Sequence, residues 1–249
     1  MSFREEINSN KRTARIVGAL FLVATVTYMV GFGLLGSLLN GSDQLSQVYG
    51  RSLQLVSGVL LEFIDAVAVA TIGIMLYPIL RKYNEVIGLG YAGTRIIECL
   101  LVILAGISSL ALIPLSQEYI QAGTANTSHF QAISTITVNQ GKLGFQIAMI
   151  ALGLGSMPFC YLLYRASLIP RLIAVLGLVG YAGLFVGGLV ELFGLNLNMI
   201  QYVPGGLFEL ILPVWLIAKG FNSPTMGAWT AKISNLGEPP GPSPEPANS

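Results

Sequence analysis

Long apolar segments alternate with short polar ones along almost the whole chain. Six of them are long enough to cross a bilayer as helices, because about 20 apolar residues cover the hydrocarbon layer. They are residues 16–39, 52–80, 88–115, 141–164, 171–193 and 201–219. The pattern predicts an all-α fold, a six-transmembrane-helix bundle, that occupies residues 16–221.

The segments outside this bundle are polar. Residues 1–15 are predicted to form a cytoplasmic N-terminal segment. Residues 222–249 hold six of the twelve prolines and predict a disordered cytoplasmic tail. Within 116–140, three apolar residues recur at a spacing of three, namely Phe130, Ile133 and Ile136. They indicate either a helix on the membrane surface or an extension of the fourth span, and we favour the extension.

Composition points to the same class of protein. The chain is 53% hydrophobic and 10% charged, whereas a soluble domain carries about 25% charged residues to keep its surface wet. The lipid bilayer is therefore the expected environment and partner of these helices.

The basic residues predict the orientation of the spans, because Lys and Arg accumulate in cytoplasmic loops. A cytoplasmic N-terminus places ten of the thirteen inside: Arg4, Lys11, Arg12, Arg15, Arg81, Lys82, Arg165, Arg171, Lys219 and Lys232. Arg51 and Lys142 then lie outside, and Arg95 lies within the third span. We expect both termini in the cytoplasm, the N-in/C-in arrangement.

Two hairpins, spans two–three and spans four–five, resemble each other at an offset of about 90 residues. The tetrapeptide Gly90-Tyr91-Ala92-Gly93 returns as Gly180-Tyr181-Ala182-Gly183. This predicts a parallel hairpin repeat, which occurs in some transporter folds. The alternative is that glycine-rich apolar helices resemble each other by composition.

Small residues line one side of the fifth span, at Gly177, Gly180, Gly183 and Gly187. Such faces let a neighbouring backbone approach closely in membranes. We expect the first hairpin to pack there, and glycine-rich faces also allow an oligomer.

Ionisable residues interrupt the apolar spans, at a cost of roughly 2.5–3.5 kcal/mol for each charge at the bilayer centre. The predicted polar intramembrane cluster consists of Glu62, Asp65, Arg95, Glu98 and Glu209. Glu62 and Asp65 share a helix face by their spacing of three, as do Arg95 and Glu98. Glu191 lies near the outer end of its span, where it can reach interfacial water.

The charges of this cluster do not balance. Arg95 neutralises one or two carboxylates, so the remaining acids must be hydrated or carry protons. A carboxyl group that can change between a hydrated, ionised form and a protonated form can bind a cation or relay protons. Alternatively, a buried ion pair only fixes the register of the helices. We expect Arg95 to contact at least one of Glu62, Asp65 and Glu98.

Prolines interrupt two spans. Pro158 is expected to kink the fourth span. Pro213, four residues after Glu209, either kinks the sixth span or breaks it so that backbone groups line a site.

Enzyme signatures are missing from the sequence, which contains no G-x-S-x-G, H-E-x-x-H or P-loop motif. The single histidine, His129, argues against a bis-histidine haem or a histidine-rich zinc site. We therefore expect no cofactor, no metal site and no nucleic-acid partner, and catalysis is the least favoured function.

Three strings resemble a known family. They are Ala14-Arg15-Ile16-Val17-Gly18, the run from Leu89 through Arg95 to Glu98, and Trp215-Leu216-Ile217-Ala218-Lys219-Gly220-Phe221. They are similar to prokaryotic membrane proteins filed as domain of unknown function 4386, over about residues 12–221. The resemblance implies a six-helix protein of the prokaryotic cytoplasmic membrane and brings no activity.

The function predicted is a small transporter or permease-like protein with an acidic and arginine-containing polar core. Its ligand is a small solute, a cation or a proton. The alternative is a non-transporting membrane protein that binds or regulates a partner through its helices. A cavity that reaches Glu62 favours transport, whereas a dry and fully paired cluster favours a structural role.

Overall fold

The fold is all-α, as the sequence predicts. The computed structural model describes residues 3–41, 43–123, 127–195, 197 and 200–222. Within these ranges the helices are α1 (Phe3–Leu39), α2 (Gln44–Gly50), α3 (Ser52–Leu80), α4 (Glu85–Leu110), α5 (Leu112–Ala122), α6 (Thr127–Arg165), α7 (Arg171–Leu192) and α8 (Tyr202–Ala218). The predicted tail, except for its first residue, lies outside the described residues.

Five helical segments are long and apolar enough to cross a membrane: Asn10–Leu39, Ser52–Leu80, Glu85–Ala122, Thr127–Arg165 and Arg171–Leu192. The sixth predicted span corresponds to α8, an apolar helix of 17 residues. At 1.5 Å per residue it is about 26 Å long, slightly less than the hydrocarbon thickness of about 30 Å. The architecture is that of a multi-pass, membrane-embedded protein.

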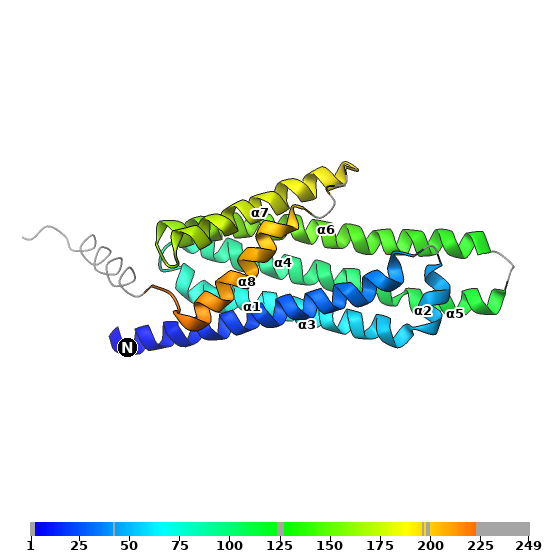
Figure 1. The fold of residues 1–249 in the computed structure, drawn as a ribbon, viewed down its shortest axis with the longest axis horizontal. Helices are drawn as coiled ribbons and strands as arrows, with labels where there is room; N and C mark the ends of the chain where they lie inside the picture. The colour runs from blue at the N-terminus through cyan, green and yellow to red at the C-terminus, as the bar shows by residue number, and fades with distance from the viewer. Residues whose placement is uncertain (1–2, 42, 124–126, 196, 198–199, 223–249) are drawn as a thin grey trace, which may run out of the picture.

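Six of the helices pack in a closed circuit (Figure 1). Helix α1 packs on α3, α3 on α4, α4 on α6, α6 on α7 and α7 on α8, and α8 returns to α1. Neighbours in this circuit are mostly neighbours in sequence, because short loops join antiparallel helices. Among the described residues α1 and α6 share no extended packing, so α8 is the helix that closes the circuit.

Glycines set how closely α8 approaches its two neighbours. A Cβ atom on Gly18 of α1 would lie 2.9 Å from the carbonyl oxygen of Pro213, and one on Gly180 of α7 would lie 2.6 Å from the nitrogen of Gly205. The expectation that the glycine face of the fifth span packs against the charged hairpin is therefore wrong. Gly177 and Gly187 of that face also meet α8 or the residue before it, at Phe208 and Gln201.

The helices extend well past the closed circuit at one end. Helix α6 is continuous over 39 residues, about 58 Å at 1.5 Å per residue, so segment 127–140 extends the fourth span, as the sequence analysis favours. The predicted third span breaks at Ala111, between α4 and α5. Pro114 explains the break, because its ring removes one backbone hydrogen bond and clashes with the carbonyl group of residue 110.

A second apolar cluster holds this extension together. Its buried members come from α1, α2, α3, α5 and α6: Leu35, Leu38, Leu45, Val48, Leu55, Val59, Leu112 and Val138. The short helix α2, between the first two predicted spans, packs mainly on α5.

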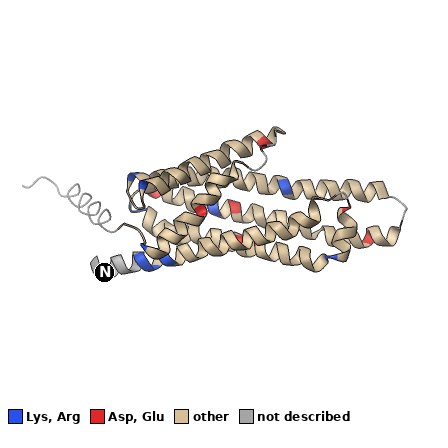
Figure 2. Cartoon of the chain, viewed as in Figure 1, with Lys and Arg blue, Asp and Glu red and all other residues tan. Residues whose placement is uncertain are grey.

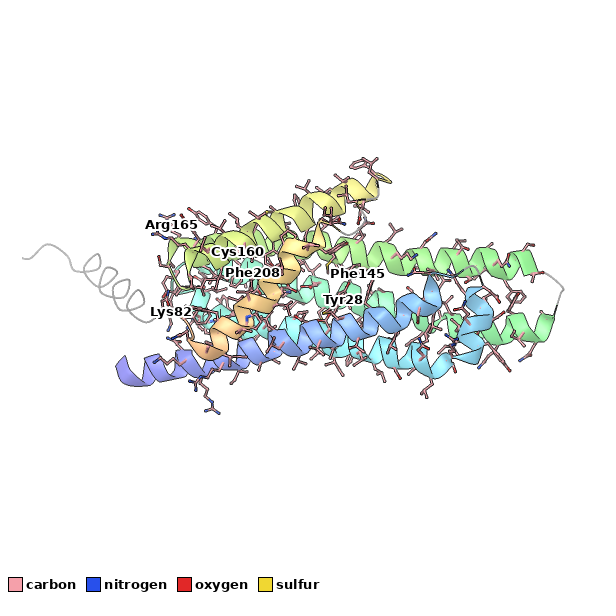
Figure 3. All side chains as sticks on the ribbon, viewed as in Figure 1. Tyr28, Lys82, Phe145, Cys160, Arg165 and Phe208 are labelled. Carbon is pink, nitrogen blue, oxygen red and sulfur yellow. The ribbon has the colours of Figure 1, made fainter. Side chains whose placement is uncertain are left out.

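The opposite end is basic. Lys and Arg residues gather there, at the end where α1 begins (Figure 2), and Lys82 and Arg165 are among them (Figure 3). The loop between α6 and α7 folds inward, so Leu168 and Ile169 are buried. Asn222 fastens it, donating from Nδ2 to the carbonyl oxygen of Ser167 at 2.8 Å and from its backbone nitrogen to that of Leu168 at 2.9 Å.

Candidate functional site

Arg95 lies at the centre of the bundle. Its residue is 1% exposed, and Nη1 donates to Oε2 of Glu98 at 3.0 Å. The spacing of three on α4 brings the two side chains to one face of the helix. The predicted contact between Arg95 and a buried acid is therefore present.

Two tyrosines complete the hydrogen bonds of the guanidinium. Nε donates to the hydroxyl oxygen of Tyr91 at 3.1 Å, and Nη2 donates to that of Tyr181 at 3.5 Å. The hydroxyl of Tyr181 in turn donates to Oε1 of Glu209 at 2.9 Å, and Oε1 lies 3.7 Å from Nη2 of Arg95. We call Arg95, Glu98, Glu209, Tyr91 and Tyr181 the Arg95 network; it joins α4, α7 and α8.

Aromatic rings cover the guanidinium of Arg95. Its central carbon lies 5.6 Å from the ring centre of Phe21 on α1 and 5.3 Å from that of Tyr91. The face of an aromatic ring attracts a cation, and more strongly where water is excluded. The ring of Tyr91 also stacks on Phe159 of α6, with centres 4.2 Å apart.

Tyr91 and Tyr181 are the network residues that sequence reasoning missed. The signal was available, because each is the tyrosine of the repeated Gly-Tyr-Ala-Gly tetrapeptide. The spacing of residues along one helix could not show that both hydroxyl groups contact the same arginine. That contact depends on the relative position of α4 and α7, which both pack on α6.

The remaining two predicted residues do not join the Arg95 network by direct contact. Asp65 is 8% exposed, and within the described part of the chain its carboxylate has no hydrogen bond or ion pair. It is close enough to interact electrostatically with Glu98, Glu209 and Arg95. Glu62, one helical turn before Asp65 on α3, is half-buried and likewise lacks such a partner among the described residues.

Glu62 instead lines an open cavity of about 510 Å³. The cavity lies between α1, α3, α4 and α6, beside the end of α7 and the start of α8. Its walls are formed by Phe32, Leu35, Gly36, Leu39, Asn40, Glu62, Val102, Ala105, Ser109, Val138, Gly141, Lys142, Phe145, Gln146, Glu191, Gly194, Leu195 and Tyr202.

Glu191 belongs to this cavity. Its Oε1 accepts a hydrogen bond from Nε2 of Gln201 at 2.6 Å, and its Oε2 accepts one from Nε2 of Gln146 at 3.3 Å. The sequence predicts that Glu191 reaches interfacial water near the outer end of its span. In the structure two amide side chains, from α6 and from the residue before α8, hold it in the cavity wall.

An aromatic layer lies where the cavity approaches the centre of the bundle. The ring of Tyr28 on α1 stacks on Phe145 of α6 with centres 5.8 Å apart, and Phe145 lies 6.5 Å from the ring of Tyr202 (Figure 3). Tyr28 is close to acids of both α3 and α8, namely Glu62, Asp65 and Glu209.

Comparison with known proteins identifies the family of the chain. A family model described as Domain of unknown function (DUF4386) matches residues 16–220. The chain belongs to this family. The DUF4386 match contains the whole Arg95 network and every residue of the cavity wall. No curated protein and no solved structure matches the chain. The family description assigns no activity. A function must therefore be inferred from the geometry of the site.

Proposed function

We propose that the protein is a small transporter of a cell membrane, whose polar core responds to a cation or a proton. The observation that carries this proposal is the open cavity of about 510 Å³ that reaches Glu62. Glu62 and Asp65 lie on one face of α3, one turn apart, so they form a step from the cavity toward the acids around Arg95. A protein interior or a water-filled cavity is where ionisable residues of membrane helices are tolerated.

The two ends of the bundle differ, which would suit alternating access. The cavity lies near the ends of α1 and α7, whereas the loop between α6 and α7 at the basic end has Leu168 and Ile169 buried. A transport cycle would loosen the stack of Tyr28 on Phe145 and open that loop. The inner opening would follow only after the outer one has closed.

The proposed topology has six crossings with both termini in the cytoplasm. The basic residues at one end support this orientation, because cytoplasmic ends carry most Lys and Arg. Helix α8 is short, but it begins at Tyr202 in the wall of the cavity. Water that fills the cavity would therefore reach the start of α8. From there, a helix of 17 residues is long enough to reach the cytoplasmic surface of the membrane.

A second function is favoured by a different observation. Every nitrogen of the Arg95 guanidinium has a partner within the Arg95 network. A paired and buried network of this kind fixes helix positions without chemistry. A membrane protein that binds or regulates a partner through rigid helices would need that network and no flux.

Reconstituted liposomes with an internal pH-sensitive dye separate the two functions. We expect the wild-type protein to carry a proton or cation flux that depends on the imposed gradient. Glu62→Gln and Asp65→Asn should each fold and abolish the pH-dependent part. Glu118→Gln is the matched control, because Glu118 is exposed on α5, away from the cavity. Absence of any wild-type flux across a range of gradients and solutes would overturn the transport proposal.

A further inference from the structure

The cavity wall is mainly apolar, although it surrounds an acid. Large hydrophobic side chains from three helices line it, including Phe32, Leu35, Leu39, Val102 and Val138. Its volume of about 510 Å³ lies within the range of roughly 300–1,000 Å³ that is usual for small-molecule sites. Such walls suit a ligand with an apolar body.

The charges of the wall leave Glu62 without a counter-ion. Three charged side chains line the cavity, Glu62, Glu191 and Lys142. Glu191 accepts hydrogen bonds from two amides. Lys142 is exposed and has no ion pair with either acid among the described residues. With all three ionised, the cavity has an excess of one negative charge, located at its half-buried acid.

Aromatic rings stand next to this acid. Phe32, Phe145 and Tyr202 line the cavity, and Tyr28 stacks on both Phe32 and Phe145 with ring centres 5.8 Å apart in each case. A ring face attracts an organic cation, and this is the usual means of recognising quaternary ammonium groups. Glu62 packs against α1 beside Phe32, because a Cβ atom on Gly31 would lie 3.2 Å from Cγ of Glu62, so the rings and the carboxylate can act on one ligand.

We propose that the cavity binds a hydrophobic organic cation, an amine or a quaternary centre on an apolar body, with Glu62 as its counter-charge. This inference rests on the transport proposal and names the class of solute. An organic anion of the same shape would meet two carboxylates. A small metal ion would need several oxygen ligands, and the described residues contain no group of three or more His, Cys, Asp or Glu side chains that could hold one.

Two ions of nearly equal shape and opposite charge test the proposal. Tetraphenylphosphonium and tetraphenylborate are titrated into the purified full-length protein in detergent, with detergent alone as the blank. We expect saturable binding of tetraphenylphosphonium that is at least tenfold tighter than any binding of tetraphenylborate. Equal binding of both ions would mean simple partition into apolar surface and would overturn the proposal, as would absence of saturable binding.

Variants of the cavity wall locate the site. Glu62→Gln should weaken tetraphenylphosphonium binding at least tenfold, Lys142→Gln should strengthen it a few-fold, and Glu118→Gln should leave it unchanged. An unaltered affinity in folded Glu62→Gln would overturn the assignment. If that variant does not fold, the comparison of the two ions on the wild type still decides.

The failure of this inference can be distinguished from the failure of the transport proposal. Flux of protons or another solute without tetraphenylphosphonium binding would refute the solute class alone. Saturable, Glu62-dependent binding without flux in liposomes would refute transport, and it would leave a receptor for organic cations.

Discussion

Tyr91 and Tyr181 place their hydroxyl oxygens against the same guanidinium, 3.1 Å from Nε and 3.5 Å from Nη2 of Arg95. The first lies on α4, one turn before the arginine, and the second lies on α7. Only Tyr181 also bonds to Glu209 of α8. It therefore links Arg95 to the last helix by hydrogen bonds, beside the ion pair of Arg95 with Glu209 at 3.7 Å.

Replacing Tyr181 by Phe should lower stability by about 1–3 kcal/mol, because Glu209 loses a buried hydrogen-bond donor. Thermal unfolding in detergent measures the change. Tyr161→Phe is the control: Tyr161 is exposed, and its hydroxyl accepts a hydrogen bond from Arg165 at 3.4 Å. Equal midpoints for the two variants would contradict the role assigned to Tyr181.

Arg95→Leu should destabilise more strongly, by about 3–5 kcal/mol, because it leaves Glu98 buried without a cation. Adding Glu98→Gln to this variant should recover part of the loss, since the uncompensated charge is removed. Denaturant titration of the single and double variants is the measurement. No recovery in the double variant would show that packing of the Arg95 side chain, rather than charge, is what matters.

The repeated tetrapeptide offers a matched pair of glycines. Gly180→Ala should cost about 1–3 kcal/mol through overpacking, since its Cβ would lie 2.6 Å from the backbone nitrogen of Gly205. Gly90 holds the same place in the first hairpin, where a Cβ would meet no atom within 4 Å. Gly90→Ala should therefore be neutral or stabilising in a thermal-melt assay. A similar loss of stability in both variants would contradict the role of Gly180 in the close packing of α7 on α8.

Topology can be checked by cysteine labelling of intact cells with an impermeant reagent, in a variant that lacks Cys99 and Cys160. We expect Ser128→Cys to react, whereas Lys82→Cys and Lys219→Cys should be protected. Labelling at position 82 but not at 128 would reverse the orientation. Labelling at 219 together with 128 would show that α8 does not cross.

The helices were largely predictable from sequence because hydrophobic length alone defines them. Predicted residues 52–80 coincide with α3, and 171–193 differs from α7 by one residue. The break at Ala111 and the short helix α2 were missed. Both lie in the extension beyond the closed circuit, where packing on α5 and α6 decides the structure more than apolar length does.

The site was predictable only where its contacts are local. The pair of Arg95 and Glu98 follows from helical spacing, and Glu62 beside Asp65 follows in the same way. The contact of Arg95 with Tyr181 and Glu209 depends on three helices distant in sequence. For the same reason, the sequence could not separate Glu62, in the cavity wall, from the Arg95 network.

The position of Glu98 on the same helix as Arg95 has a consequence for how the protein enters the membrane. During synthesis α4 emerges long before α7 and α8, so Tyr181 and Glu209 do not yet exist when Arg95 must leave water. A partner three residues away travels with the arginine and offsets its charge at that moment. The helix can then be released into lipid without waiting for the rest of the chain, and the later helices assemble on a pair that is already neutral.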